Sequence, residues 1–475
     1  MRSRPWLPAV AWLGCCAVLS ALGPSSSRRI TWDDLAPLHS RLAANAIGAA
    51  SLPSFLQRTH ALNTQRVREG DLDHLVFYLL QSTRFTERPP IEPALSAKAV
   101  VESLAPTDRA VFLRDPSAVA APVPPPVSAR IGDLLRALNN PTRDARLSYF
   151  HSLLASTFPD AHGWAADISR EYVRAMRFIY EKEFVAQRSE RPAEAVAELY
   201  RSRGLSTDTA VEAGYAVYTG LGVIASLEPA RRIRRVLIVG PGLDLAPRTA
   251  LHEDSAPESY QPWAVIDALV SVGLSRLDDL TVVGADINPR VVDYLRRSRQ
   301  APPTLTLASE IRETESVKLV PEYRDYFAHL GAAIAAPGRD GRAGSVGPAP
   351  PPAGQLRKTI TVGPAAARAL DAVALDVVTE RLDGDPFDLV IATNILPYFN
   401  DVELMLAVSN VAAMLRPGGI FLHNEARTAL ADVTSAVGLT FQQARHVTIA
   451  DVRGAPSPLA DSVWLHVKDA RPSGR

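Results

Sequence analysis

The chain has 475 residues, which is enough for two or three domains. Lys and Arg together number 51, as do Asp and Glu, so the formal net charge is zero and argues against a generally basic nucleic-acid-binding protein; we expect no nucleic-acid partner. The two cysteines, Cys15 and Cys16, are adjacent, which excludes a disulfide, a cysteine-ligated zinc site or a cysteine nucleophile farther along the chain. The 10 histidines show no close spacing of the HExxH kind, so we expect no metal.

Residues 1–24 are predicted to be a signal peptide or a membrane anchor. An apolar run covers residues 6–23, with Arg2 and Arg4 before it and Arg28 and Arg29 after it. A basic start followed by such a run is typical of both kinds of segment, and arginines on both sides give no clear orientation. The sequence leaves open whether the segment is removed on export or associates the chain with a membrane.

Residues 25–228 are predicted to form an all-helical domain. Apolar residues recur at the i, i+3, i+4, i+7 spacing of a one-faced helix in three segments, 72–80, 127–138 and 168–179. A further helix is expected near 211–218, directly before the first predicted strand. Around its start, Thr207, Thr209 and Tyr215 could reach a ligand bound beside that strand, although a core-facing position in an ordinary helix is favoured for Tyr215.

From residue 233 to residue 470 the pattern changes to short β-branched runs that alternate with helical stretches, which predicts βαβ units and a parallel sheet. Strands are predicted near 235–239, 280–285, 372–378, 387–393 and 418–424. The last two apolar runs are joined by the short connection RGAPSPLA, which fits an antiparallel hairpin and is too short for a parallel crossover. The predicted fold class is therefore α/β, with a Rossmann-like sheet that ends in an antiparallel hairpin. Residues 336–356 are rich in Gly, Pro and Ala and are predicted to be a disordered insertion.

The first predicted strand runs into a glycine turn, and the second ends in a carboxylate. In VLIVGPGLD (236–244), Gly240 and Gly242 allow a sharp turn and a close approach of the backbone to a ligand, although a purely structural turn has the same pattern. In LTVVGADINP (280–289), Asp286 is followed by Ile287. The Asp286 carboxylate could accept hydrogen bonds from two ribose hydroxyls, or it could cap the helix that begins at Pro289.

These two motifs, together with FDLVIATNILPYFN…LRPGGIFLHNE (387–425), resemble the nucleoside-binding half of class I S-adenosylmethionine-dependent methyltransferases. The resemblance implies S-adenosylmethionine as the cofactor, methyl transfer as the reaction, and a methyltransferase sheet with a terminal hairpin. It also implies that Gly240, Gly242, Asp286 and Ile287 bind the methionyl and ribose parts of the cofactor. Because methyl transfer is an in-line displacement on an activated carbon, the protein mainly has to hold donor and acceptor in line.

A narrower resemblance covers ALDVVTERLDGDPFDLVIATNILPYFN (374–400), which is similar to the chemotaxis-receptor glutamate methyltransferases. It implies that Asp376 and Val377 hold the adenine amino group and ring, and that Asn394 both contacts the cofactor and faces the methyl group. Asn394 and Glu425 are the candidate catalytic residues, with Glu425 as a base for an acceptor that must lose a proton. Thr393 stands where that family has arginine, so the receptor glutamate is not carried over. The methyl acceptor, a small molecule or a protein carboxylate, stays unidentified.

Two other functions use similar motifs. In a nicotinamide-binding oxidoreductase the acidic residue follows the glycines by about 20 positions, whereas Asp286 follows Gly240 by 46. A catalytically degenerate scaffold or sensor is favoured by Ile238 and Asp244, which stand where methyltransferases usually have an acidic residue and a third glycine. The signal-like N-terminus predicts export or anchoring, whereas a cofactor made in the cytosol predicts an enzyme that faces the cytoplasm. The sequence does not decide between these locations.

Overall fold

The structure is a computed structural model that describes residues 26–139, 144–245, 253, 256–336 and 353–470. The predicted signal or anchor segment lies outside the described residues, and so does most of the predicted insertion at 336–356. Within the described residues, no helix combines the length and the apolar composition that a membrane span requires.

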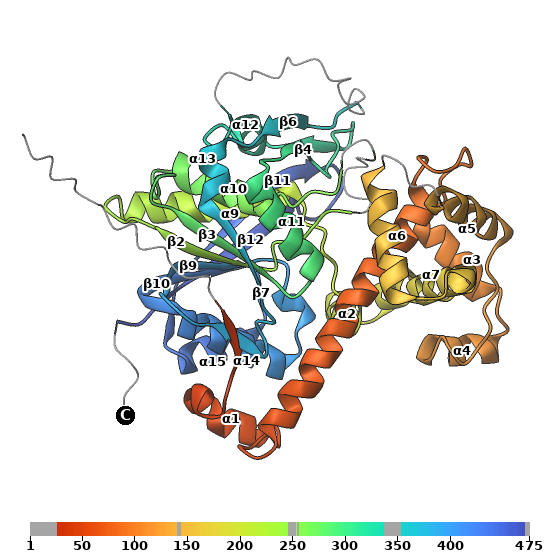
Figure 1. Cartoon of the computed structure of the whole chain (residues 1–475), viewed down its shortest axis with the longest axis horizontal. Helices are drawn as coiled ribbons and strands as arrows, with labels where there is room; N and C mark the ends of the chain where they lie inside the picture. The colour runs from red at the N-terminus through yellow and green to blue at the C-terminus, as the bar shows by residue number, and fades with distance from the viewer. Residues whose placement is uncertain (1–25, 140–143, 246–252, 254–255, 337–352, 471–475) are drawn as a thin grey trace, which may run out of the picture.

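A mixed sheet of eight strands forms the centre of the molecule, in the order β5-β11-β12-β10-β9-β2-β3-β7 (Figure 1). Its strands are β2 (Arg235–Val239), β3 (Thr281–Asp286), β5 (Val317–Leu319), β7 (Leu370–Ala374), β9 (Phe387–Ala392), β10 (Leu415–His423), β11 (Leu439–Val452) and β12 (Leu459–Lys468). The five strands from β10 to β7 are parallel, and β12 runs antiparallel to both β10 and β11. The predicted α/β fold with a terminal antiparallel hairpin is therefore confirmed.

The parallel strands are buried on both faces, which explains their continuous apolar runs in the sequence. In β2, Val236 and Ile238 belong to one hydrophobic core, and Leu237 and Val239 belong to the other. Helices α9 (Val211–Leu227), α10 (Gln261–Ser271) and α11 (Pro289–Gln300) cover the first core, and α14 (Asp401–Met414) and α15 (Thr428–Ala436) cover the second (Figure 1).

The N-terminal region is helical except for β1 (Ser27–Arg29), which pairs with β8 (Glu380–Leu382) beside the second core. Its helices are α1 (His39–Ala44), α2 (Leu52–Gln81), α3 (Pro93–Glu102), α4 (Pro106–Arg114), α5 (Pro125–Leu138), α6 (Ala145–Thr157), α7 (Trp164–Tyr180) and α8 (Pro192–Ser202). The three helical segments predicted from apolar spacing lie in α2, α5 and α7. Helices α3 to α7 gather around the C-terminal half of α2 as a lobe at the right of Figure 1.

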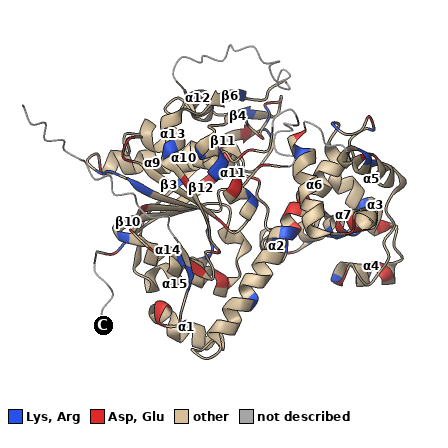
Figure 2. Ribbon diagram, viewed as in Figure 1, with Lys and Arg blue, Asp and Glu red and all other residues tan. Residues whose placement is uncertain are grey.

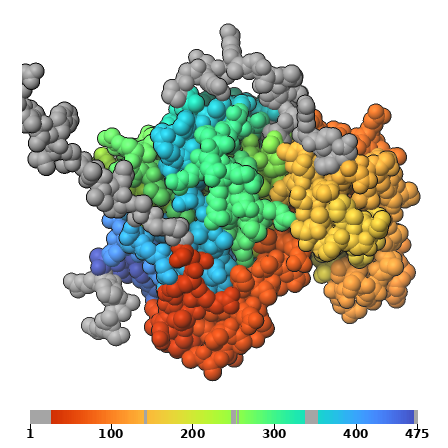
Figure 3. Space-filling view, viewed as in Figure 1, coloured from red at the N-terminus to blue at the C-terminus, as the bar shows by residue number. Residues whose placement is uncertain are grey.

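Helix α2 connects the two cores. Its first turns bury Leu52 and Leu56 in the core under α14, whereas residues 72–80 bury their apolar face in the core of the helical lobe. With 30 residues it is about 45 Å long, and its middle passes the edge at which the parallel strands end. In the space-filling view, orange residues of this region lie directly against the green and blue C-terminal part (Figure 3). The predicted boundary near residue 228 therefore marks a change of sequence pattern, and residues from both sides of it contribute to each hydrophobic core.

Several short elements between β3 and β7 were not predicted. Strands β4 (Thr304–Ala308) and β6 (Arg357–Thr361) form a small antiparallel sheet of their own, and helices α12 (Pro321–His329) and α13 (Pro364–Ala369) lie beside it. Strand β5 has three residues, which is too short to show a periodic pattern. Basic and acidic residues are interspersed over the helical lobe and around the sheet (Figure 2).

Candidate cofactor site

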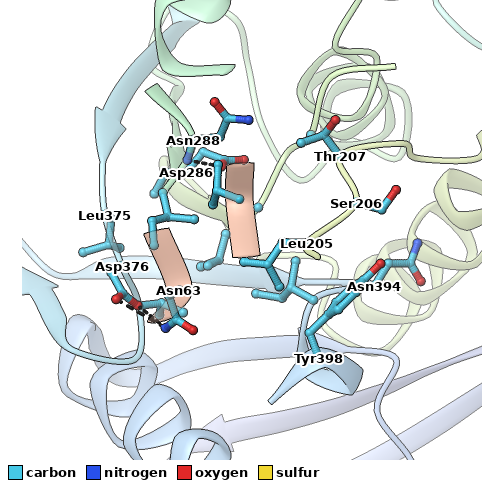
Figure 4. Close-up of a pocket in the computed structure, with 18 of the residues that line it drawn as sticks. Asn63, Leu205, Ser206, Thr207, Asp286, Asn288, Leu375, Asp376, Asn394 and Tyr398 are labelled. Carbon is cyan, nitrogen blue, oxygen red and sulfur yellow. Dashed lines mark hydrogen bonds between the residues drawn. The ribbon is translucent and has the colours of Figure 1, made fainter. Parts of the chain in front are cut away.

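A cavity opens at the carboxyl ends of β2, β3, β7 and β9, the edge at which open α/β sheets bind ligands (Figure 4). About 740 Å³ of space free of protein atoms lies at this edge, a volume that includes space open to solvent. The structure places all of the predicted cofactor-binding residues in its lining: Gly240, Gly242, Asp286, Ile287, Asp376, Val377 and Asn394. Glu425 lies elsewhere.

The glycine turn after β2 forms one wall of the cavity, and only glycine fits at its two key positions. Gly240 and Gly242 have left-handed backbone conformations, with φ angles of 69° and 74°. A Cβ atom on Gly240 would overlap the side chain of Ile395, and one on Gly242 would overlap the carbonyl oxygen of Thr207. The backbone of Gly240 and Gly242 therefore lines the cavity, with Ile395 and Thr207 packed closely against it.

Asp286 ends β3 at the cavity and is buried. Its Oδ1 accepts the backbone N–H of Asn288 at 2.8 Å, while Asn288 itself caps α11 by accepting the N–H of Arg290 at 3.0 Å. Burial raises the pKa of Asp286 to about 7, more than the backbone hydrogen bonds from Asn288 and Gly242 lower it. Asp286 is thus not the helix cap that the sequence left open, and its carboxylate lies in the wall of the cavity.

A second buried carboxylate, that of Asp71 in α2, accepts hydrogen bonds from the side chain of Asn288. The Asn288 Nδ2 donates to both Asp71 oxygens at 3.2 and 3.3 Å, and the Tyr149 hydroxyl donates to Asp71 Oδ1 at 3.1 Å. Burial raises the pKa of Asp71 to about 6. Since Asn288 also caps α11, this contact ties α2 to the turn that presents Asp286.

Asp376 lies in the turn after β7, and α2 holds its carboxylate as well. Asn63 Nδ2 donates to both Asp376 oxygens at 3.4 Å, and His60 Nδ1 lies 3.0 Å from Oδ2 (Figure 4 shows the Asn63 bonds). The backbone N–H of Val378 donates to Oδ1 at 3.1 Å. The hydrogen bond to Asp376 raises the pKa of His60 above its ordinary value. Asp376 therefore anchors α2 at the cavity, a role that the sequence did not predict.

The sequence predicted only a core helix for α2, and it missed the polar face that precedes the apolar one. One signal in the sequence is the group of polar residues that precedes the apolar stripe, because polar side chains that are buried on a helix need partners from another element. Asn63 of this face lines the cavity beside the apolar Val67, and three more of its polar residues contact the cavity walls: His60, Asp71 and His74.

Helix α2 crosses the segment 203–209 at two glycines. A Cβ atom on Gly70 would overlap the carbonyl oxygen of Leu205, and one on Gly204 would overlap the backbone at Gly70. The N–H of Leu205 donates to the carbonyl of Arg66 at 2.8 Å. This close crossing lets Leu205 line the cavity opposite the strand ends.

Thr207 and Thr209, both expected near a ligand, line the cavity. The Thr207 hydroxyl donates to the carbonyl of Leu243 at 2.7 Å, and its Oγ1 lies 3.2 Å from Nε2 of the buried His74. Tyr215 does not line the cavity, because its ring packs against Tyr323 and Tyr326 in the first core.

Arg66 of α2 joins three segments around the cavity. It is 3% exposed, and its guanidinium donates to the carbonyls of Arg203 and Tyr398 at 2.9 Å each. Tyr398 follows β9 and lines the cavity. The side chain therefore fixes α2, the segment before α9 and the loop after β9 relative to one another.

The two candidate catalytic residues lie apart. Asn394 follows β9 at the exposed end of the cavity with a left-handed φ of 62°, and its Oδ1 accepts Nδ2 of Asn424 at 2.6 Å. Glu425 follows β10 and lines a different hollow, where it pairs with Nε of Arg427 at 3.0 Å. Arg427 in turn donates to the carbonyls of Leu396 and Phe399 at 2.7 Å each. Glu425 thus supports the loop that carries Asn394 rather than facing the cavity.

His423 also lies away from the cavity. It is buried beside His466, with 3.1 Å between Nε2 of His423 and Nδ1 of His466, and burial lowers its pKa to about 3. It is therefore neutral at ordinary pH. In the part of the chain that the structure describes, no three His, Cys, Asp or Glu side chains come together as ligands for a metal would.

No protein-family model matches the chain, and neither does any curated protein. Among solved structures, it is similar to the N-methyltransferase NodS of Bradyrhizobium japonicum WM9 in complex with S-adenosyl-L-homocysteine, with 12% identity over 53% of this chain and 85% of that one and a TM-score of 0.27. It is also similar to the magnesium protoporphyrin IX methyltransferase ChlM of Synechocystis PCC 6803 with bound SAM, with 10% identity over 61% of this chain and 94% of that one and a TM-score of 0.28. Such distant likenesses decide neither the activity nor the cofactor of this chain, and the resemblance to chemotaxis-receptor methyltransferases stays a prediction.

Proposed function

We propose that this chain binds S-adenosylmethionine in the cavity and transfers its methyl group to an acceptor molecule. One observation carries the proposal: three separate strand ends bring a glycine turn, a buried carboxylate and the Asp376–Val377 pair to one cavity. The class I methyltransferase resemblance implies the first two for the methionyl and ribose parts of the cofactor, and the narrower resemblance to chemotaxis-receptor methyltransferases implies the Asp376–Val377 pair for adenine. They lie at the edge where the sheet reverses its winding, between β2 and β9.

The residues present fit such a ligand. The glycine turn lines the cavity and takes left-handed backbone conformations that a larger residue would disfavour. The Asp286 carboxylate, with two oxygens that can each accept more than one hydrogen bond, can accept the two ribose hydroxyls. Ile287 and Val377 on one side, with Val67 and Leu205 on the other, give apolar walls for the adenine ring.

When bound, the cofactor supplies an activated methyl group on a sulfonium, so the chain has little acid–base work to do. Its own residues bind, orient and exclude water, and α2 and the segment 203–209 cover the strand ends for that purpose. Asn394, at the exposed end of the cavity, is proposed to contact the acceptor. The acceptor is proposed to be a small molecule or a protein carboxylate, the latter on the narrower resemblance to chemotaxis-receptor methyltransferases.

The test is calorimetric titration of the folded chain with S-adenosylmethionine and with S-adenosylhomocysteine. The proposal expects one binding site for each, with a dissociation constant in the micromolar range that small-molecule cofactors of this size reach. The absence of heat and of thermal stabilisation at millimolar ligand would instead leave the degenerate scaffold as the better account.

Cofactor affinity is expected to rise with pH by up to about 10-fold between pH 6 and pH 8. Burial raises the pKa of Asp286 to about 7, so about one tenth of it is ionised at pH 6 and about nine tenths at pH 8. The ionised carboxylate can accept hydrogen bonds from both ribose hydroxyls. In the protonated carboxyl one oxygen carries a proton, so that oxygen is a poorer acceptor for a hydroxyl. Calorimetry at pH 6, 7 and 8 measures the rise.

The Asp286→Asn variant is the control for this pH dependence, because Asp71 and His60 also titrate near the cavity. It should bind weakly, with a much flatter pH profile. The stability of the ligand-free protein changes with pH in the opposite direction to the affinity. Because the pKa of Asp286 is raised on folding, this carboxyl lowers the free energy of unfolding as pH rises from about 4 to about 7. If cofactor affinity in Asp286→Asn rises with pH as steeply as in the wild-type protein, the pH dependence belongs to Asp71 or His60 instead.

A further inference from the structure

Asn63 of α2 brings to the cavity a buried acceptor that has no partner. The residue is 1% exposed, and its Nδ2 donates to both oxygens of Asp376. Because a carboxylate can only accept, this contact fixes the amide with its nitrogen toward Asp376 and its Oδ1 turned away, as Figure 4 shows. Among the described residues that line the cavity, Asn63 is the only one with a fully buried side-chain N or O atom that lacks a hydrogen-bond partner.

Asp376, in contrast, already has its donors. Its carboxylate receives the Asn63 amide, the His60 ring and the backbone N–H of Val378. A further amino group at Asp376 would have to displace one of these contacts, whereas an amino group at Asn63 Oδ1 would satisfy an atom that is otherwise buried at a cost.

We infer that Asn63, rather than Asp376, accepts the exocyclic amino group of the adenine ring, and that Asp376 and His60 are positioning residues that hold the Asn63 amide. The inference rests on the proposed function and deepens it. It moves the recognition of the base from the strand ends to α2, a helix that precedes the strand-and-helix region of the chain. The ligand group selected is an amino group on a planar ring, which excludes nucleosides with a carbonyl oxygen at that position.

The experiment compares two ligands on two variants of the full chain. The ligands are S-adenosylhomocysteine and its analogue with hydrogen in place of the exocyclic amino group. Wild-type protein is expected to bind the analogue about 10-fold more weakly, because the buried acceptor then stays unpaired. In Asn63→Leu, which has a similar volume and no acceptor, the two affinities should come within about 2-fold of each other. Thr59→Val, a buried change on α2 outside the cavity, should keep the wild-type preference.

Each outcome has one meaning. If Asn63→Leu folds and still prefers the amino ligand by the wild-type ratio, the inference is overturned. If Asn63→Leu fails to fold, the smaller Asn63→Ala takes its place, and the same two results support or overturn the inference. Equal affinity of the wild-type protein for the two ligands overturns it in either case. Failure of the proposed function looks different, because the wild-type protein would then bind neither ligand.

Discussion

Asp286→Ala is expected to weaken the binding of S-adenosylhomocysteine by about 100-fold or more while leaving the protein folded. The side chain ends β3 at the cavity, and in the proposed complex it accepts two ribose hydroxyls. Each hydrogen bond to a charged group contributes about 1.5–3 kcal/mol, so losing two corresponds to about 10²–10⁴-fold in affinity. Calorimetric titration of both proteins at pH 8, where the wild-type carboxyl is mostly ionised, measures the difference.

The fold should survive because the wild-type carboxyl is itself costly in this place. Burial raises its pKa to about 7, so at pH 8 the folded protein holds an ionised group in an environment that disfavours it. Its removal should therefore leave the melting temperature at pH 8 unchanged or higher. Asp293→Ala, an exposed carboxylate on α11, is the matched control and should alter neither property. Unchanged affinity in a folded Asp286→Ala protein would remove the ribose assignment.

The strand ends of the site could be predicted from the sequence because local rules place them. Each parallel strand is a short apolar run, and the carboxyl ends of parallel strands meet at one edge of the sheet. A glycine turn after β2 and a carboxylate after β3 must therefore lie close together, although 46 positions separate Gly240 from Asp286. The same rule brought Asp376 and Asn394 to the cavity.

The rule failed for Glu425 because strand order decides which strand ends face the cavity. The winding of the sheet reverses between β2 and β9, and β10 lies one strand farther out. The loop 394–399, held by Arg427, stands between the end of β10 and the cavity. Strand order is a property of the whole fold, and no local pattern around Glu425 contained it.

The role of α2 could not be predicted because it depends on contacts between segments far apart in the chain. His60 and Asn63 meet Asp376 across 316 and 313 positions, and Asp71 meets Asn288 across 217. Apolar spacing identifies the core-facing stripe at 72–80, but it is silent about which partners a preceding polar stripe finds. The glycine at position 70, inside a helix, was a clue to a close backbone contact rather than to a weak helix.

This crossing leads to the second large effect: Gly70→Ala is expected to destabilise the protein by about 1–3 kcal/mol, although alanine favours a helix. The new Cβ atom would overlap the carbonyl oxygen of Leu205, which is backbone and cannot rotate away. The segment 203–209 must then move off α2, and because Leu205 and Thr207 line the cavity, S-adenosylhomocysteine affinity should fall as well. Thermal or urea unfolding, with and without the ligand, measures both effects.

Gly222→Ala in α9 is the matched control, because it is the same substitution inside a helix where no atom outside the helix lies within 4 Å of the new Cβ. There the gain in helix propensity acts alone, so stability should increase by about 0.5–1 kcal/mol with no change in ligand affinity. The two variants thus change stability in opposite directions for one physical reason, the presence or absence of a backbone neighbour. A Gly70→Ala protein that is as stable as Gly222→Ala and keeps wild-type affinity would contradict this account. It would show that α2 and the segment 203–209 do not cross this closely beside the cavity.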